Sequence, residues 1–253
     1  MYKKILSFIA SFIKSNKKLC IALAVALGMA LLIFWILFSN GYSGLHIHTR
    51  ANDGQIKVAC VGDSVTYGHG IKSWAKNNYP AQLQKILGDT YHVQNFGHSG
   101  KTVSDNGDQP YTESKQYKKS LEYDADVLVI MLGTNDSKPE NWTNVETFIN
   151  EYDELVESYK KNNPDIEIIL CTPPCAFYQD EKMSKTTNFD IQPDIVQTIK
   201  NRIKVYALAR GYKLVDIFDI TQYHYEWFDD NVHPSKEGAS AIAEAVAKKI
   251  KIE

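Results

Sequence analysis

The sequence lacks the marks of several large functional classes. Its 28 Lys and Arg residues are outnumbered by 30 Asp and Glu residues, which gives a net charge of −2. A nucleic-acid-binding surface needs basic side chains to neutralise phosphates, so we expect no nucleic-acid partner. The sequence contains no H-E-x-x-H zinc motif, no P-loop and no dinucleotide-binding glycine fingerprint. A G-x-S-x-G motif is also missing, because glycine directly follows the serine in Gly97-His98-Ser99-Gly100.

Cysteine and histidine are too sparse for a metal site. Four cysteines are present, and Cys171 and Cys175 form a C-x₃-C pair around two prolines. This spacing is poor for zinc and no second Cys/His pair accompanies it, so we expect two semi-buried thiols, with a disulfide as the alternative. His46 and His48 lie in a polar segment without a carboxylate cluster. We therefore assign no metal and no cofactor.

Acidic residues are absent from residues 1–41, which contain five lysines. The remainder has 23 basic against 30 acidic residues, a net charge of −7. Residues 19–38 (LCIALAVALGMALLIFWILF) are uncharged and overwhelmingly apolar. A helix of this length crosses ~30 Å of hydrocarbon.

A membrane anchor is the interpretation that best fits this run. A core helix would have a polar face, and the apolar region of a signal peptide is typically only ~7–15 residues. Ser39, Asn40 and Gly41 form no small-x-small cleavage site, so an uncleaved signal anchor is favoured over a cleaved signal. The lysines precede the run, which predicts that residues 1–18 are cytoplasmic and the catalytic part extracytoplasmic. Residues 39–54 are then a linker.

Strand-like and helical segments alternate after the linker. Short apolar runs predict strands at residues 56–61, 91–95, 127–132, 166–170 and 213–216, and helical periodicity predicts helices at 78–87, 145–161, 191–209 and 235–250. Alternation of this kind predicts an α/β fold with three layers, in which helices cover both faces of a parallel sheet. We interpret residues 55–253 as one domain.

Polar clusters follow three of these strands, and a fourth precedes the last helix. They are Gly62-Asp63-Ser64, Ser99-Gly100-Lys101-Thr102, Gly133-Thr134-Asn135-Asp136 and Asp230-Asn231-Val232-His233-Pro234. Ligands of parallel sheets bind at the carboxyl ends of the strands, so we expect these loops to meet. Serine needs an imidazole to take its proton, the imidazole needs a carboxylate, and the oxyanion needs N–H donors. The clusters supply all of these groups.

The four clusters, in this order, resemble the blocks of the SGNH (GDSL-type) hydrolase family, in the branch of carbohydrate acetylesterases. The resemblance extends over residues 55–253 and implies a flavodoxin-like, five-stranded parallel sheet. It implies that Ser64 is the nucleophile and that Asp230 and His233 activate it. Asp229 is the alternative acid, but its spacing does not match the motif.

The resemblance also implies three donors to the oxyanion: the backbone N–H of Ser64, the backbone N–H of Gly100 and the side chain of Asn135. Gly97 is the competing assignment for the second donor. The alternative to a catalytic site is that Ser64 and Asn135 cap helices and that His233 is a surface histidine.

The substrate is less well specified by the sequence. The segment after Asn135 is similar to that of bacterial carbohydrate-acetylesterase-like proteins, so we expect Trp142 to stack on a sugar ring or, equally, to pack against the following helix. Asp63 is a further expected substrate contact. Tyr178 and Phe189, in the long loop after the fourth strand, are candidate contacts, with surface packing as the default.

We expect a membrane-anchored serine esterase that hydrolyses short-chain, acetyl-type esters of a carbohydrate or cell-wall substrate. A lysophospholipase or thioesterase would use the same residues, and a non-catalytic membrane-tethered binding module is the other alternative. Acyl transfer to an alcohol would also use this site. The sequence assigns no oligomeric state.

Overall fold

The computed structural model describes residues 13–39, 48–179 and 188–250, and contains one five-stranded sheet. All strands are parallel and their order is β2-β1-β3-β4-β5. The strands are β1 (Ile56–Gly62), β2 (Tyr91–Gly97), β3 (Val127–Met131), β4 (Glu167–Cys171) and β5 (Lys213–Val215). This is the order of a flavodoxin-like sheet, and it confirms the predicted fold class.

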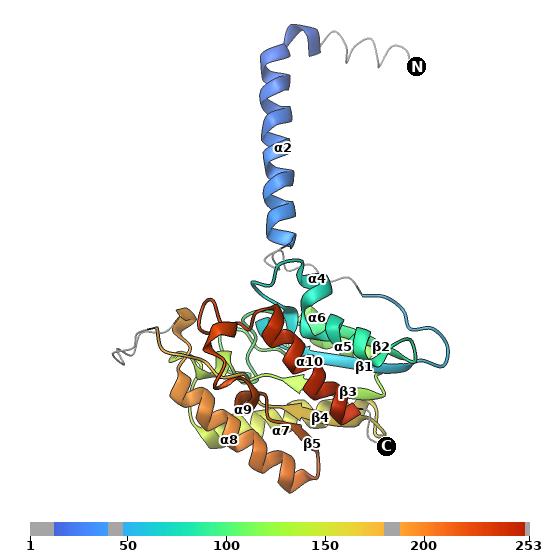
Figure 1. The fold of residues 1–253 in the computed structure, drawn as a ribbon, viewed down its shortest axis with the longest axis vertical. Helices are drawn as coiled ribbons and strands as arrows, with labels where there is room; N and C mark the ends of the chain where they lie inside the picture. Colours follow the sequence, from blue (N-terminus) through green and yellow to red (C-terminus); the bar gives the residue numbers. More distant parts are fainter. Residues whose placement is uncertain (1–12, 40–47, 180–187, 251–253) are drawn as a thin grey trace.

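Helices cover both faces of the sheet, as Figure 1 shows. One face packs against α5 (Tyr79–Leu87) and α10 (Lys236–Ile250). The other face packs against α6 (Lys115–Glu122), α7 (Val145–Asn162) and α8 (Pro193–Arg210). The core therefore consists of two apolar layers, one on each side of the strands.

The strands divide their side chains between these two layers. In β1, Val58 and Cys60 belong to the α5/α10 layer, whereas Ala59 and Val61 belong to the α7/α8 layer. Successive strand residues point to opposite faces, so a strand buried on both sides is apolar throughout. All five residues of β3 are buried for this reason.

Several helices were not predicted from the sequence. Helix α6 (KQYKKSLE) has few apolar residues, and only Tyr117 and Leu121 pack against the core. The remaining elements are too short to show a helical period: α3 (Ser64–Tyr67), α4 (Trp74–Asn77), α9 (Ile217–Thr221), η1 (Asn135–Ser137), η2 (Asn188–Asp190) and η3 (Tyr225–Trp227).

The N-terminal apolar run forms α2 (Lys17–Ser39), which contains the predicted span 19–38. None of its residues is buried, and Figure 1 shows it projecting from the α/β domain. It is the one helix among the described residues that is long and apolar enough to cross a membrane, with a mean hydropathy of 2.8. Residues 1–12 of the predicted cytoplasmic segment and 40–47 of the predicted linker, with His46, lie outside the described residues.

Candidate active site

The turn from β1 into α3 places Ser64 at the first position of a short helix. Asp63 caps this helix, because its Oδ1 accepts a hydrogen bond from the Val65 N–H at 2.9 Å. The helix ends at Gly68, whose φ of 95° is the left-handed conformation that glycine adopts most easily. The short helix that begins with Ser64 is therefore capped at both ends, and it lies at the carboxyl end of β1.

A chain of hydrogen bonds joins Ser64, His233 and Asp230. The Ser64 Oγ lies 2.9 Å from His233 Nε2, and His233 Nδ1 lies 2.7 Å from Asp230 Oδ2. Ser64 and His233 are 169 positions apart in the sequence, so only the fold brings them together. Asp229, the alternative acid, has an exposed side chain. Asp230 Oδ2 thus contacts Nδ1, the ring nitrogen of His233 that does not contact Ser64. A carboxylate in this position is able to orient the imidazole as a general base.

The carboxylate of Asp230 is fixed by its own loop. Its Oδ1 accepts the backbone N–H groups of Val232 at 3.0 Å and His233 at 2.7 Å. Burial by itself raises the pKa of Asp230, but the hydrogen bonds and the charge of His233 outweigh burial and lower the pKa to about 2. Asp230 is therefore an anion throughout the physiological pH range.

Two other loops contribute amide groups to the pocket that Ser64 lines. Asn135 Nδ2 donates one hydrogen bond to the Lys101 carbonyl at 3.1 Å, and an amide nitrogen carries a second N–H. Gly100 lines the same pocket as Ser64 and Asn135, with a φ of 80°. The N–H of Gly97, the competing donor, is bonded instead to Asn95 Oδ1 at 2.8 Å.

These groups border a pocket of about 130 Å³. Its walls are formed by Ser64, His69, Ser99, Gly100, Asn135, Lys138, Phe189, Ile191, Val232 and His233. The pocket therefore contains the predicted serine, histidine, glycine and asparagine. Phe189 is the one of the two aromatic candidates from the long loop that reaches the pocket walls; Tyr178 is not among them.

Asp63 and Trp142 do not line this pocket. Asp63 is 1% exposed and serves as the cap of α3. Trp142 lies beside the start of α7, where its ring centroid is 6.4 Å from that of Phe148. The structure thus gives Asp63 the role of a helix cap and places Trp142 in helix packing, the alternative that the sequence left open for it.

Two buried carboxyl groups, Asp63 and Asp136, are the sequence neighbours of Ser64 and Asn135. Burial raises the pKa of Asp63 to about 6 and that of Asp136 to about 7, although backbone hydrogen bonds act in the opposite direction. Asp136 Oδ1 accepts N–H groups from Val103 and Ser104, each at 2.9 Å. Because Asp136 follows Asn135, this contact ties the Gly100 loop to the Asn135 loop.

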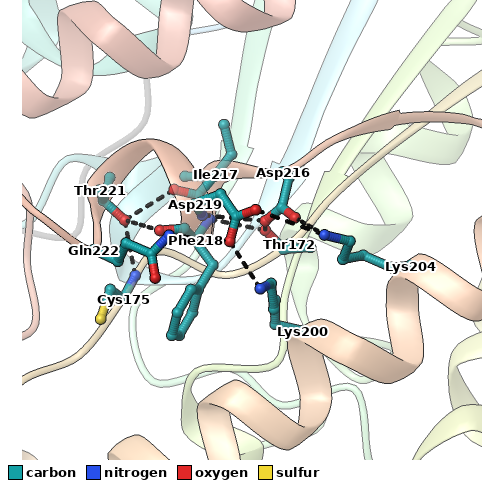
Figure 2. Close-up of polar contacts among 10 residues, drawn as sticks. All are labelled: Thr172, Cys175, Lys200, Lys204, Asp216, Ile217, Phe218, Asp219, Thr221 and Gln222. Atoms are coloured by element: carbon teal, nitrogen blue, oxygen red, sulfur yellow. Dashed lines mark hydrogen bonds and ion pairs between the residues drawn. The ribbon is translucent and has the colours of Figure 1, made fainter.

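A polar network holds α9 in place. This helix precedes η3 and the loop with Asp230 and His233. Figure 2 shows Thr172, at the end of β4, bound to Asp216 at 3.1 Å and to the Phe218 N–H at 2.9 Å. Lys200 pairs with Asp219 at 2.8 Å, and Lys204 pairs with Asp216. The network fixes α9 to β4 and α8, and thereby fixes the start of the histidine loop.

The loop after β4 packs directly on the histidine loop. Its Phe177 N–H donates to the Asn231 carbonyl at 3.0 Å, and Cys175 and Val232 share one small apolar cluster. Cys171 and Cys175 are buried free thiols, in agreement with the favoured interpretation of the pair.

Sequence reasoning missed His69 and Lys138 as pocket residues. Both lie shortly after a predicted cluster: His69 is five positions after Ser64, and Lys138 is two positions after Asp136. Glycine at a helix C-terminus commonly reverses the chain, so Gly68 is the signal that would have indicated His69. Lys138 has no such signal, because η1 is too short to predict.

Comparison with known proteins agrees with this geometry. Residues 60–241 match the model of the GDSL-like lipase/acylhydrolase family. An acetylxylan esterase from Xylanibacter ruminicola is 36% identical over 217 residues, which are 78% of this chain and 43% of that protein. The chain thus spans less than half the length of this relative.

Two solved structures have the same fold. Est24, a carbohydrate acetylesterase from Sinorhizobium meliloti, superposes with a TM-score of 0.62 at 20% identity, covering 78% of this chain and 98% of that one. The aryl esterase of M. smegmatis gives a TM-score of 0.61 at 16% identity, with the same coverage of 78% and 98%. The predicted family, and with it the enzyme class of ester hydrolases, is confirmed by the family match. Since the matched residues make up most of the sequence, the chain belongs to the GDSL-like lipase/acylhydrolase family.

Proposed function

We propose that the chain is a membrane-anchored serine esterase that removes acetyl groups from a carbohydrate or cell-wall substrate outside the cytoplasm. The observation that supports this most directly is the hydrogen-bonded chain from Ser64 through His233 to Asp230 at the wall of a small pocket. Deacylation by an activated serine needs no metal or organic cofactor.

The proposed reaction has two halves. Ser64 Oγ attacks the ester carbonyl carbon while His233 Nε2 accepts the serine proton. The oxyanion receives N–H groups from Ser64, Gly100 and Asn135 Nδ2. His233 then donates its proton to the leaving alcohol oxygen, the C–O bond breaks, and the acetyl group remains on Ser64.

In the second half, water replaces the alcohol. His233 takes a proton from the water, whose oxygen attacks the acetyl carbon, and the same donors bind the second oxyanion. Collapse releases acetate and returns the proton to Ser64 Oγ. Asp230 remains an anion and stabilises the imidazolium in both halves.

The size of the pocket supports a short acyl group. A volume of about 130 Å³ next to Ser64 is enough for an acetyl group, and an octanoyl chain would extend beyond the residues that line the pocket. The relative that is 36% identical is named an acetylxylan esterase, which supports a carbohydrate ester.

Helix α2 supports the membrane location. It is continuous from Lys17 to Ser39 and has no buried residue, unlike a core helix. Lysines lie at its N-terminal end and no basic residue lies in its last turn. By the positive-inside rule this distribution directs the α/β domain out of the cytoplasm.

Activity of the purified chain on 4-nitrophenyl acetate tests the nucleophile. We expect Ser64→Ala to lower kcat by at least about 10³-fold and to abolish labelling by a fluorophosphonate probe, with an unchanged Tm. A Ser64→Ala variant that retains most of the activity would exclude Ser64. Failure of the wild-type protein to react with the probe would instead favour a non-catalytic binding module.

Chain length tests the acyl group. We expect kcat/KM to fall at least about 10-fold between the acetyl and the octanoyl 4-nitrophenyl esters, because the longer chain exceeds the pocket. A preference for the octanoyl ester would favour a lysophospholipase or thioesterase.

A further inference from the structure

Two side chains at the wall of the pocket have no part in the mechanism described above. Both contact His233: the ring centroid of His69 lies 4.6 Å from that of His233, and the centroid of Phe189 lies 5.1 Å from it, edge to face. The two rings are also 6.4 Å apart, at 89° to one another. His69 and Phe189 thus form two perpendicular ring surfaces beside His233, and we call this pair the corner.

Phe189 is held in a costly conformation. Its φ of 58° and ψ of 22° lie in the left-handed region, which bulky residues rarely adopt. Half of the side chain is exposed (51%), so its burial contributes little free energy to offset the cost of this backbone conformation. The preceding Asn188 donates to the Asp230 carbonyl at 2.7 Å, which fixes this segment to the catalytic loop. Strain of this kind is concentrated at ligand contacts.

His69 offers a neutral polar edge beside this ring. It follows the glycine cap of α3 and is half-buried. Burial, and then the charge of His233, lower the pKa of His69 to about 4, although Asp230 acts in the opposite direction. A neutral imidazole has one N–H donor and one acceptor nitrogen, so a hydroxyl group is able to bind it through either kind of atom.

The position of the corner determines whether it contacts the acyl part or the alcohol part of a bound ester. Asn135 and Gly100 supply the proposed oxyanion donors, so the acyl carbonyl lies toward them. The leaving oxygen receives its proton from His233 Nε2 and therefore lies on the histidine side. The alcohol attached to that oxygen then extends past His233, toward the two rings.

We propose that His69 and Phe189 form a leaving-group subsite for a saccharide ring, in which the C–H face of the ring packs on Phe189 and a hydroxyl next to the ester binds His69. This assignment rests on the proposed function and specifies its substrate: an acetylated ring with a hydroxyl on the adjacent carbon. Such a ring fits the corner because its aliphatic C–H face matches the apolar Phe189 ring and its adjacent hydroxyl matches the polar His69 ring.

Three acetates separate the two contacts: ethyl acetate, cyclohexyl acetate and trans-2-acetoxycyclohexanol. In the full-length protein, Phe189→Ala is expected to raise KM about 5- to 10-fold for both ring esters and less than about 2-fold for ethyl acetate. Phe189→Trp should retain the wild-type KM. Tyr223→Ala, which removes an aromatic side chain that is 85% exposed and outside the pocket walls, is the matched control.

His69→Ala should lower kcat/KM about 5- to 10-fold for the hydroxylated ester only, the effect of one lost hydrogen bond. His69→Gln, which keeps a neutral donor and acceptor, should restore most of it. Equal losses on all three acetates would assign both residues a merely structural role, and no losses would show that the ring lies elsewhere; either result overturns the subsite. If wild-type protein hydrolysed none of the three, the proposed function itself would fail.

Discussion

At the scale of single residues, one loop contains both the proposed acid, Asp230, and the proposed base, His233, within four positions. Asp230 accepts three hydrogen bonds from its own loop, two from backbone N–H groups and one from the His233 ring. The acid is therefore oriented even when other parts of the domain move. The histidine depends in addition on Ser64, which a different element supplies.

Asp230→Asn tests this division of roles. The amide keeps the size of the side chain and an oxygen for the backbone N–H groups, but it removes the charge that supports the imidazolium. We expect kcat to fall roughly 10²- to 10⁴-fold. His233→Ala, which removes the base itself, should lower kcat further, to the level of Ser64→Ala. A smaller loss in His233→Ala than in Asp230→Asn would show that Asp230 is not the orienting acid.

Ionisation of Asp136 is expected to make the free energy of unfolding depend on pH. Its pKa rises from about 3.9 in the unfolded chain to about 7 in the fold, so the folded state binds the proton more tightly. The resulting stabilisation is complete below pH ~3.9 and is lost as the pH rises through 7. Asp136→Asn cannot lose a proton and is free of this effect.

We therefore expect the Tm of Asp136→Asn, relative to that of the wild type, to increase by roughly 3–10 °C between pH 4 and pH 8. Thermal unfolding of both proteins across this range measures the difference. The comparison cancels the histidines with lowered pKa values, which act in the opposite direction in both proteins. A constant difference in Tm would show that Asp136 is ionised in the fold throughout.

At the scale of elements, the position of Ser64, the proposed nucleophile, depends on how closely β2 approaches α3. Gly97, the last residue of β2, lies against the backbone of α3: an added Cβ would meet Tyr67 N at 2.3 Å and Thr66 C at 2.7 Å. These are backbone atoms, so no side-chain rotation relieves the overlap. A methyl group at position 97 must displace the helix that begins at Ser64.

Gly97→Ala should therefore lower both Tm and activity. We expect a destabilisation of about 2–4 kcal/mol and a kcat reduced at least about 10-fold in the protein that remains folded. Gly88→Ala is the control, because an added Cβ at Gly88 meets no atom within 4 Å and the φ of 76° makes alanine costly there for a reason that does not involve α3. It should lose stability with an unchanged kcat, and an unchanged kcat in Gly97→Ala would mean that α3 does not move.

The elements that could be predicted were those with a long repeating pattern. The apolar run around Val129 and the periodic residues of α7 specify a buried strand and an amphipathic helix, and both were confirmed. The parallel order of strands explains why the loops with Ser64 and Asn135 meet, whereas His233, which precedes α10 and does not follow a strand, was expected beside Ser64 from the family resemblance. By contrast, His69 and Phe189 reach the pocket through a glycine cap and a left-handed turn, whose direction a local pattern does not encode.

At the scale of the whole molecule, the end of α2 contacts the α/β domain next to α3, the short helix that begins with Ser64. Phe38 packs edge to face on Trp74 at 5.9 Å, and Trp74 stacks on Tyr67 of α3 at 4.6 Å. A short row of aromatic rings thus joins the proposed membrane anchor to the element that positions Ser64. Aromatic rings of this kind are common at the membrane–water interface.

The proposed topology is testable with cysteine labelling in intact cells. The described native cysteines of the α/β domain are buried, so a membrane-impermeant maleimide should not reach them. Lys118 is exposed on the domain and Lys14 is exposed before α2. We expect Lys118→Cys to be labelled in intact cells, and Lys14→Cys to be labelled only after the membrane is permeabilised, because lysines N-terminal to the span hold that end in the cytoplasm.

Carbonate extraction of the same cells separates the alternatives. An uncleaved anchor retains the full-length chain in the membrane pellet, where both introduced cysteines are present on one polypeptide. A cleaved signal would release a shorter chain that lacks position 14, and the reverse labelling pattern would place the domain inside the cell. A cleaved signal would therefore overturn the membrane anchor but leave the domain outside the cytoplasm. Only the reverse labelling pattern would remove the basis for an extracytoplasmic carbohydrate ester, and neither result would affect the chemistry assigned to Ser64 and His233.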